Sequence, residues 1–361
     1  MKKGRFWVGI VISIVALALA FRQVDFRAVW AALIGANYVL LVASLVPLIL
    51  FLVLRAFRWR LLFYPTKGLR VLNLFAVINI GYLLSNIFPA RLGDVARAYL
   101  IGDSEDVSRA SAFSTIVAER VLDALCAVGG FFLVLPFAPL PDWMIRAGLV
   151  IGAAALAVLV VFVVLSRRRE FTLGLLDRIL SLLRWPDCET MSGAWERLAT
   201  RTRIGFLAGL PWVDRSGIAR FVSSLIDGLS GITTLRLGPV LVLWSVAIWA
   251  VISVFYWLVV LAFDPSQPFV AGLAIASVTA LGMTVPASPG YIGVFEILAR
   301  ETMVLFGMQP ELALGNALVA HAIVYLVYTV MGLVSMAQQN LSYTDIQRRI
   351  SSEENPVSYT H

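Results

Sequence analysis

The chain has 361 residues, of which 60% are apolar and only 14% are charged, and its formal net charge is +7. Soluble domains carry about 25% charged residues, so this composition excludes a soluble globular protein and indicates a polytopic membrane protein. The apolar runs are long and do not alternate with polar residues, which predicts membrane helices rather than barrel strands. Most of the positive charge comes from arginines in loops, so we attribute it to membrane orientation and expect no nucleic-acid partner.

Apolar runs of two kinds follow one another along the chain. We interpret six of them as full membrane spans: 6–21, 38–54, 111–138, 144–166, 240–263 and 312–336. Two further runs, 71–88 and 269–285, each end in a segment that proline and glycine interrupt, and a short helical stretch follows. We interpret these two as re-entrant hairpins, which leave the membrane on the side they entered.

The distribution of Lys and Arg supports the hairpin interpretation. With the N-terminus in the cytoplasm, 22 of the 29 basic residues fall inside, including the Arg55–Arg70 group and the eleven arginines of 167–236, and four fall outside. Three arginines fall at membrane depth: Arg91, Arg97 and Arg120. Two full spans in place of the hairpins would put 167–236 outside, against the positive-inside rule. We therefore predict a multi-pass protein of the cell (cytoplasmic) membrane with both termini cytoplasmic.

The two interrupted segments resemble each other. FPARLGDVARAYL from Phe88 and SPGYIGVFEILAR from Ser288 align Pro89 with Pro289 and Gly93 with Gly293. The topology gives the two segments opposite orientations, which is typical of inverted-repeat transporters that bind substrate at the repeat interface. We predict an all-α integral membrane bundle of about six full spans plus two re-entrant hairpins in an inverted repeat. Its transmembrane domain is 1–341, with inverted halves at roughly 1–166 and 240–341, a basic cytoplasmic amphipathic segment at 167–239, and a polar, disordered tail at 342–361.

The second interrupted segment has the features of a helix start inside the membrane. Ser288 is expected to cap a half-helix that begins at Pro289, where the missing N–H of proline costs nothing. The free N–H groups and positive dipole end of such a helix suit an anion. Gly290 and Gly293 are expected to allow a tight turn or the close approach of a ligand. The alternative is that these glycines only permit close helix packing.

Charged residues also occur where the chain should lie in lipid. Six fall at or near membrane depth: Arg91, Asp94, Arg97, Glu119, Arg120 and Asp123. At about 3 kcal/mol each, exposing all six to lipid would cost on the order of 18 kcal/mol, so we expect them to face inward and pair. One interpretation is a closed ion network that pins hairpin to span. The other is a network with spare positive charge that binds an anionic head group, which the planar fork of arginine suits.

Two further polar residues lie in the last third of the chain. Glu296 belongs to the second short helix, and we expect it to pair with the arginines or with a substrate amine. His321 lies in the last span, with Tyr325 and Tyr328 on roughly the same face. A single histidine in a membrane helix is either a packed hydrogen-bonding residue or part of a proton relay, and the sequence leaves both open.

Three segments together resemble a known family. NIFPARLGDVARAYL, AERVLDAL and PASPGYIGVFE are similar to the signature segments of the lysylphosphatidylglycerol synthase transmembrane-region family, also called flippase-like or UPF0104 proteins. The likeness spans almost the entire chain and includes RAFRWRLL at 55–62. It implies two inverted halves with re-entrant helices that move or expose a lipid across the cytoplasmic membrane. In fused members an attached synthase makes the aminoacylated lipid. This chain ends soon after its last span, so we expect no synthase domain and no aminoacyl transfer.

The resemblance also implies which residues bind the lipid head group. By motif these are Arg91, Gly93, Asp94, Arg97, Glu119, Arg120, Asp123, Pro289, Gly290, Gly293 and Glu296. We add Ser288 as the predicted helix cap, and His321. The histidine is a departure, because many members have an arginine at that place in the last span, and it bears on the head-group charge that this chain handles.

The sequence therefore favours ATP-independent flipping or scrambling of an anionic lipid, such as a phospholipid or a polyprenyl-phosphate-linked lipid. The phosphate-binding lysine loop of ATP-driven pumps is missing. A secondary transporter of a small solute or ion is the alternative. We expect no enzyme, catalytic residue, metal or cofactor, because the arginines beside the carboxylates disfavour a divalent metal. Expected partners are membrane lipids, with a separate lipid-modifying synthase or glycosyltransferase and a homo-oligomer as further candidates.

Overall fold

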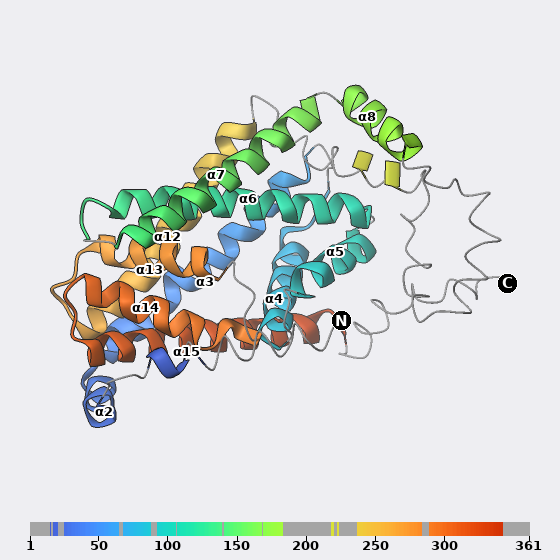
Figure 1. Cartoon of the computed structure of the whole chain (residues 1–361). Coiled ribbons are helices and arrows are strands. Elements are labelled where there is room, and N and C mark those ends of the chain that lie inside the picture. The colour runs from blue at the N-terminus through green and yellow to red at the C-terminus, as the bar shows by residue number, and fades with distance from the viewer. Residues whose placement is uncertain are drawn as a thin grey trace, which may run out of the picture.

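The computed structural model of the chain describes twelve parts of it (Figure 1). They are residues 15, 17–20, 25–64, 68–87, 92–105, 107–138, 141–167, 169–182, 218–219 with 222–223, 237–283 and 289–341. Every regular element in these parts is a helix. Most of the predicted first span, most of the segment 183–236 and the tail lie outside the described residues, and so do Arg91 and Ser288.

The helices follow the predicted runs closely. In the first part of the chain they are α2 (Phe26–Gly35), α3 (Tyr38–Leu62), α4 (Val71–Ile87), α5 (Leu92–Glu105), α6 (Arg109–Val134), α7 (Asp142–Arg167) and α8 (Arg169–Leu182). In the last part they are α12 (Leu237–Phe263), α13 (Phe269–Gly282), the short 3₁₀ helix η1 (Pro289–Tyr291), α14 (Val294–Leu305) and α15 (Pro310–Gln338). Helix α2 was not predicted, and the Asp25 side chain caps it by accepting the Arg27 N–H.

Helix length and the outer surface identify a helical membrane protein. Helices α3, α12 and α15 are long and apolar enough to cross a bilayer. The outer face of α3 carries Val39, Val42 and Val46, whose exposed fractions are 77%, 66% and 69%. Apolar side chains spaced three and four residues apart suit lipid rather than water. Of the about six predicted full spans, these three are long and apolar enough among the described helices. The other three stay a prediction.

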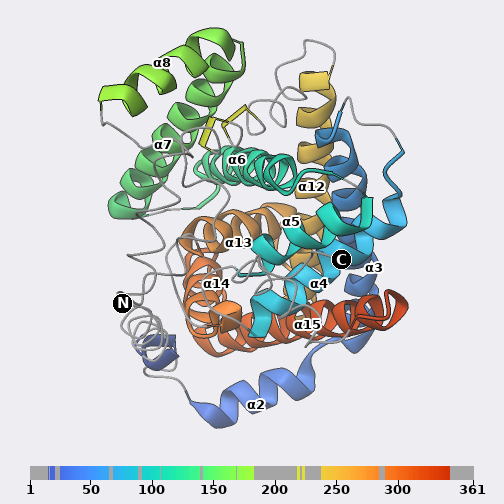
Figure 2. The same ribbon diagram turned by 90° about the vertical axis from the view of Figure 1, so that its right-hand side faces the viewer.

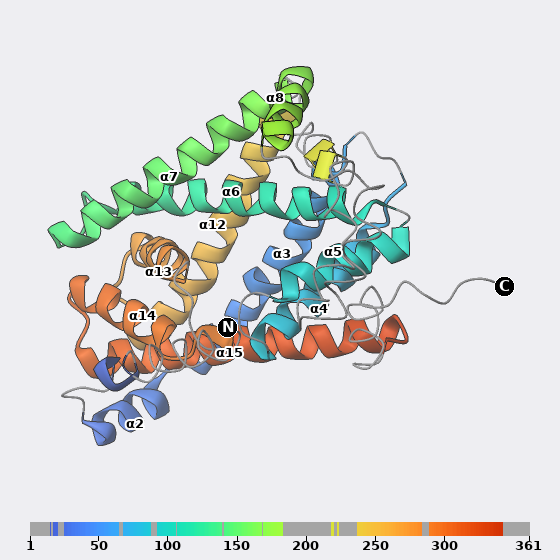
Figure 3. The same cartoon turned by 45° about the vertical axis from the view of Figure 1, so that its right-hand side comes forward.

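Two pairs of short helices stand where hairpins were expected. Helix α4 ends at Ile87 and packs against α5, and α13 ends at Gly282 and packs against α14. With 17 and 14 residues, α4 and α13 are about 25 and 21 Å long, which is less than the hydrocarbon core of about 30 Å. Figures 1 and 3 show the α4–α5 pair at one end of the bundle and the α13–α14 pair at the other. That they are re-entrant hairpins in a bilayer stays a prediction.

The two helix sets also pack in matching ways. Helix α3 packs against α12, α4 packs against α15, and α13 packs against α6. Helices α4, α5 and α6 are successive neighbours, as are α13, α14 and α15. Exchanging α3–α6 with α12–α15, in that order, leaves these contacts unchanged. Figure 2 shows α7 and α8 to one side of this bundle, next to α6.

A small apolar core holds α6 against α13 through Phe131 and Val278, and two larger cores hold the other interfaces. One gathers buried side chains of α3 to α6, among them Trp59, Ile78 and Ile101. The other joins α3 to α12 through α15, with Leu52 and Phe255 at its centre. Since α3 contributes to both cores, it connects the two helix sets, and the polar residues described below lie where the sets meet.

Helices α4 and α5 approach each other at Gly81 and Gly93. A Cβ atom on Gly93 would overlap the Gly81 carbonyl oxygen and the Ser85 hydroxyl. A Cβ atom on Gly81 would overlap the Arg97 side chain. Gly93 lies inside the first turn of α5 rather than in a turn facing a ligand. Gly93, which the family resemblance implied as a head-group residue, therefore serves the close packing of α5 against α4.

We expect Gly93→Ala to lower the free energy of unfolding by about 1–3 kcal/mol, because the α4 backbone must move to admit the methyl group. Gly129→Ala is the matched control, since a Cβ atom there meets no other atom within 4 Å. Thermal unfolding in detergent, followed by size-exclusion chromatography, measures both variants. A melting temperature of Gly93→Ala equal to that of the wild type would contradict the close approach.

Candidate functional site in the centre of the bundle

Seven charged side chains from three helices form one network of ion pairs. They are Arg55 and Arg58 on α3, Asp94 and Arg97 on α5, and Glu119, Arg120 and Asp123 on α6. Four are cations and three are anions, so the described network has a formal charge of +1. The sequence predicted that the charges of α5 and α6 face inward and pair, and the structure confirms it for the described residues.

The carboxylate of Glu119 is the centre of the network and is fully buried. Arg97 Nη2 donates to its Oε2 atom at 2.8 Å, and Arg55 Nη2 donates to its Oε1 atom. Arg58 Nη2 lies 3.5 Å from the same Oε1 atom. The Arg97 guanidinium is also 4.2 Å from the centre of the Trp59 ring. These contacts tie α3, α5 and α6 together out of reach of solvent, and we call Arg55, Arg58, Arg97 and Glu119 the buried lock.

Asp123 connects the buried lock to the rest of α6. It accepts hydrogen bonds from Arg55 Nη2 at 3.0 Å and from Arg58 Nη2 at 2.7 Å. Both arginines were expected to follow a span that ends at residue 54, whereas α3 continues to Leu62 and both side chains are buried in the bundle. The spacing of Arg55 and Arg58, three residues apart with Trp59 next to them, is the signal that was available. Such spacing puts both guanidinium groups on one helix face.

Arg120 differs from the other arginines of the network. Its Nε and Nη2 atoms donate to Asp94 Oδ2 and Oδ1 at 3.1 and 2.6 Å, which is a bidentate pair. Its Nη1 atom lies 3.9 Å from Asp123 Oδ2, too far for a hydrogen bond. The Arg120 side chain is 33% exposed, whereas that of Arg97 is 2% exposed. Arg120 therefore keeps a donor available on the open side of the network.

The open side of Arg120 faces a cavity of about 310 Å³. Its charged lining residues are Arg55, Asp94, Arg120 and Asp123, and its ring-bearing lining residues are Phe51, Tyr82, Trp249, Tyr256, Tyr291, Phe295, His321, Tyr325 and Tyr328. The Tyr82 and Tyr328 rings are stacked with their centres 4.3 Å apart. Because these residues come from both helix sets, the cavity lies at the junction of the sets. We call it the central cavity.

The second helix set contributes an acid–base pair of its own. Glu296 Oε1 lies 2.6 Å from His321 Nδ1, and Glu296 Oε2 accepts the Gly293 N–H at 2.6 Å. The expectation that Glu296 pairs with the arginines is therefore wrong. The predicted helix start is wrong as well, because α14 begins at Val294 rather than at Pro289. Positive φ angles of 68° at Gly290, 57° at Tyr291 and 92° at Gly293 interrupt the helix in between.

The two acid–base pairs occupy corresponding places. Asp94 and Arg120 connect α5 to α6 and are 26 residues apart. Glu296 and His321 connect α14 to α15 and are 25 residues apart. The exchange of helix sets described above maps the helices of the first pair onto those of the second, although the alignment of Gly93 with Gly293 pairs Asp94 with Val294 rather than with Glu296. One set thus places a permanent cation at the central cavity, and the other places a titratable base there.

The predicted head-group residues divide into three groups. Asp94, Arg120, Asp123, Gly290 and His321 line the central cavity. Among the described residues, the members that do not line it are Gly93, Arg97, Glu119, Pro289, Gly293 and Glu296. Arg91 and Ser288 lie outside the described residues. The predicted site residues did not include Arg55, Tyr82, Asn86 and Tyr256, which also line the cavity. The last three lie in apolar runs where no local pattern marks them, whereas Arg55 had the signal of its spacing from Arg58.

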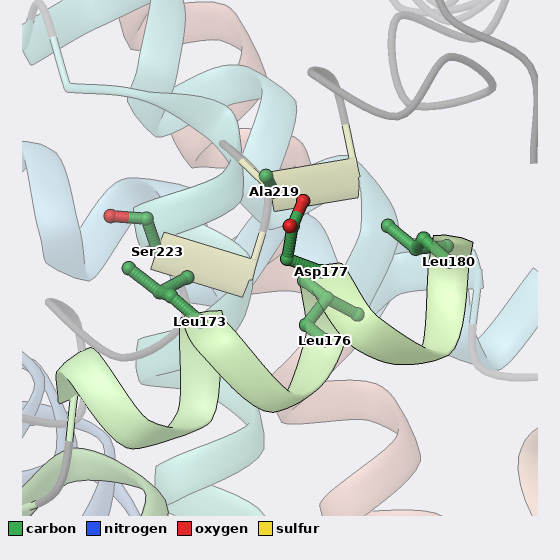
Figure 4. A pocket seen from close by; sticks show the side chains of 6 residues that line it. All are labelled: Leu173, Leu176, Asp177, Leu180, Ala219 and Ser223. Atoms are coloured by element: carbon green, nitrogen blue, oxygen red, sulfur yellow. The ribbon is translucent and has the colours of Figure 1, made fainter. Parts of the chain in front are cut away.

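A second hollow, of about 360 Å³, lies along α8 (Figure 4). Its lining residues are Leu173, Leu176, Asp177, Leu180, Ala219 and Ser223. The only charged group among them is a carboxylate, so this hollow does not suit an anion. The central cavity is the better candidate for the functional site.

A helical membrane bundle with a charged, ring-lined central cavity defines the class of this protein, and comparison defines its family. Residues 6–332 match the family described as Lysylphosphatidylglycerol synthase TM region, so the chain belongs to that family, as the sequence motifs indicated. No solved structure matches the chain.

Three relatives illustrate the range of the family. Glycosyltransferase AglD of Haloferax volcanii is 28% identical over 93% of this chain and 54% of its own length, so the chain spans about half of that relative. A UPF0104 membrane protein of Methanothermobacter thermautotrophicus is 24% identical over 91% of this chain and 93% of the relative. Another UPF0104 membrane protein, from Methanocaldococcus jannaschii, is 20% identical over the same two shares.

These names correct one expectation. The sequence analysis expected no enzyme, because it found no acid–base or metal constellation. The family is named after a synthase, and a relative that covers nearly the whole chain is named a glycosyltransferase. The expectation is therefore wrong. The names of the family and of the relative carry this information, and the arrangement of charged residues in the sequence does not.

We expect Arg97→Met to lower the free energy of unfolding by about 3–5 kcal/mol, because it takes one cation from the buried carboxylate of Glu119. The double variant Arg97→Met with Glu119→Gln should recover part of the loss. Arg70→Met is the control, since Arg70 pairs with Glu105 at the surface and its side chain is 73% exposed. Its effect should stay below about 1 kcal/mol. Equal thermal stability of Arg97→Met and Arg70→Met in detergent would contradict the buried lock.

Proposed function

We propose that this chain holds the anionic head group of a lipid in the central cavity and moves it between the two leaflets, as the membrane part of a lipid-modifying system. The observation that carries the proposal is Arg120, which has a donor available at the cavity wall while Asp94 fixes its orientation. An arginine held in this way suits one phosphate oxygen, because a hydrogen bond between two charged groups is stronger than a neutral one.

The charge and size of the site support a head group. Within the ion network, the donor that remains available belongs to the cation Arg120, which favours a negatively charged group at that point of the cavity wall. A volume of about 310 Å³ is at the small end of ligand pockets, which hold about 300–1,000 Å³. A cavity of this size holds a head group while the acyl chains stay in the surrounding lipid. The volume alone would also suit a small solute, and the reason for preferring a lipid is the family of the chain, described as a lysylphosphatidylglycerol synthase region.

The matching packing of the two helix sets supports the inverted-repeat part of the proposal. In such transporters the substrate lies at the repeat interface, and one half rocks against the other around it. The contacts of α3–α6 and α12–α15 agree under exchange, and the central cavity takes its lining from both sets. The short pairs α4–α5 and α13–α14 then act as re-entrant hairpins that enter from opposite faces.

The names of the relatives support the lipid-modifying part. They are a synthase of lysylphosphatidylglycerol for the family and a glycosyltransferase for one relative. A synthase of lysylphosphatidylglycerol and a glycosyltransferase both attach polar groups. In a lipid the polar group is the head group, which is the part that the central cavity can hold. Translocation by this chain would supply or remove the lipid of such a reaction. A synthase or glycosyltransferase is accordingly the proposed protein partner.

We expect the protein in proteoliposomes to speed the movement of fluorescent phosphatidylglycerol between leaflets, measured by extraction of the outer leaflet with albumin. Arg120→Gln should slow this movement about tenfold or more, because a charge-assisted hydrogen bond contributes roughly 1.5–3 kcal/mol. Arg146→Gln is the control, since Arg146 is exposed on α7 and its Nε donates only to the Asp142 carbonyl. No acceleration with any of several anionic lipids would overturn the proposal.

The hairpin topology has its own test. In a variant without Cys126 and Cys188, a cysteine in place of Asp103 at the end of α5 should react with a membrane-impermeant thiol reagent from the cytoplasm only. A cysteine in place of Gln309, which is exposed just before α15, should react from the outside only. Labelling of the residue 103 variant from outside would show that α4 and α5 form a full crossing rather than a hairpin.

A further inference from the structure

The pair Glu296–His321 is a titratable group that the proposed translocation leaves without a role. The Glu296 residue is 5% exposed, and the His321 side chain is 13% exposed and lines the central cavity. Glu296 Oε1 and His321 Nδ1 are 2.6 Å apart. With Glu296 ionised, the carboxylate only accepts hydrogen bonds, so Nδ1 of His321 carries the proton. The Gly293 N–H holds the other carboxylate oxygen, so the carboxylate and the imidazole are both fixed in orientation.

The second ring nitrogen of His321 is the one that can take up a proton. Nε2 makes no hydrogen bond to any residue that the structure describes, and other atoms do not fully enclose it. It therefore retains contact with open space, and the space beside His321 is the central cavity. The Phe295 ring lies 4.6 Å from the imidazole centre and the Tyr325 ring 6.4 Å from it, so aromatic side chains flank this base.

The charged and titratable groups around His321 leave it as the group that responds near neutral pH. The groups that face it or share its cavity are Glu296 on α14, Tyr82 on α4, Tyr256 on α12, Tyr291 on η1, Tyr325 and Tyr328 on α15, Arg55 on α3, Asp94 on α5, and Arg120 and Asp123 on α6. Tyrosines ordinarily titrate near pH 10 and arginines above pH 12. The carboxylates each have a basic partner. Of these described groups, histidine alone ordinarily changes charge between about pH 5 and 8.

The charge of the cavity depends on that one proton. With His321 neutral, the four arginines of the network face three network carboxylates and Glu296, and the described charges cancel. A head group with one negative charge then leaves an excess negative charge in a poorly hydrated site, which is costly. A proton on Nε2 of His321 restores the balance. Entry of the anion therefore raises the affinity of His321 for a proton.

We propose that Glu296–His321 is a proton-binding site that couples occupancy of the central cavity to proton movement, an inference that rests on the proposed function. When an anionic head group enters, Nε2 binds one proton from the water on the side of entry. When the head group leaves on the other side, Nε2 releases the proton there. No bond of the lipid is made or broken. The lipid and the proton therefore cross together, and a pH gradient can drive the anionic lipid in one direction.

The corresponding pair in the other helix set gives the coupling its physical logic. Arg120, held by Asp94, stays charged at any physiological pH and provides constant attraction for the anion. His321, held by Glu296 in the corresponding place, provides attraction only when protonated. One wall of the central cavity thus has a permanent cation and the other has a conditional one.

The direct test measures protons taken up on binding. Purified full-length protein in detergent, weakly buffered and with a pH-sensitive dye, is titrated with soluble dihexanoyl-phosphatidylglycerol. We expect an uptake of about one proton per bound lipid above pH 7, and an apparent affinity that falls up to about tenfold per pH unit on the alkaline side. Dihexanoyl-phosphatidylcholine, which has no net charge, should cause no uptake.

Variants locate the effect. His321→Gln keeps a hydrogen-bonding side chain but does not titrate, so it should abolish proton uptake and make the affinity independent of pH. Glu296→Gln removes the carboxylate that stabilises the imidazolium, so it should shift the pH dependence to lower pH. Glu301→Gln removes a carboxylate from the same helix, where it pairs with Arg300 away from the cavity lining. It should behave as the wild type.

The outcomes separate the coupling from the proposed function. Binding without proton uptake, or a wild-type pH dependence in His321→Gln, would overturn the coupling. If fluorescent phosphatidylglycerol still crosses proteoliposomes in that case, the proposed translocation stands. Neither binding nor translocation of an anionic lipid at any pH from 5.5 to 8.5 would overturn both. Should His321→Gln fail to fold, the shift expected of Glu296→Gln decides the question.

Discussion

Glu119 has no exposed surface, and an ionised carboxylate in that position must have cations within hydrogen-bond reach or unfold the helices around it. Arg55 from α3 and Arg97 from α5 meet this requirement. Because the three residues lie on three helices, the need to neutralise one carboxylate determines how α3, α5 and α6 face each other. The orientation of α6 in turn places Arg120 and Asp123 at the central cavity. The open site therefore depends on the closed one.

The ion network has an enclosed end and an open end. Arg97 and Glu119 are buried and pair with each other, and their further partners are charged groups of the same network. Arg120 shares two donors with Asp94 and keeps its side chain partly open. The buried end of the network thus stabilises the fold, and its open end places the Arg120 guanidinium at the cavity. A substitution at one end should be read by stability, and one at the other by lipid handling.

The two helix sets carry different charged groups: α3, α5 and α6 hold the ion network, and α14 and α15 hold the pair Glu296–His321. Asp94–Arg120 and Glu296–His321 connect corresponding helices at nearly equal separations along the chain. The matching helix contacts give the two walls of the cavity a similar arrangement, and the side chains distinguish the walls. An arginine in one set and a histidine in the other make the cavity electrically asymmetric. Charge transfer across a membrane is expensive, and the proposed coupling would use this asymmetry to move a charged lipid in one direction.

Local sequence determined the membrane class, the ends of α4 at Ile87 and α13 at Gly282, the inward placement of the charges of α5 and α6, and the family. It could do so because the length of an apolar run, a proline or glycine, and the cost of a charge in lipid all act at short range. Tertiary structure decided the partners. Arg55 reaches Glu119 across 64 residues, and His321 reaches Glu296 across 25. It also showed that Gly93 serves helix packing. Such pairings form only when the helices pack together. The apolar residues around each charged residue fit several neighbouring helices equally well, so the pattern along one helix does not determine which helix becomes its neighbour.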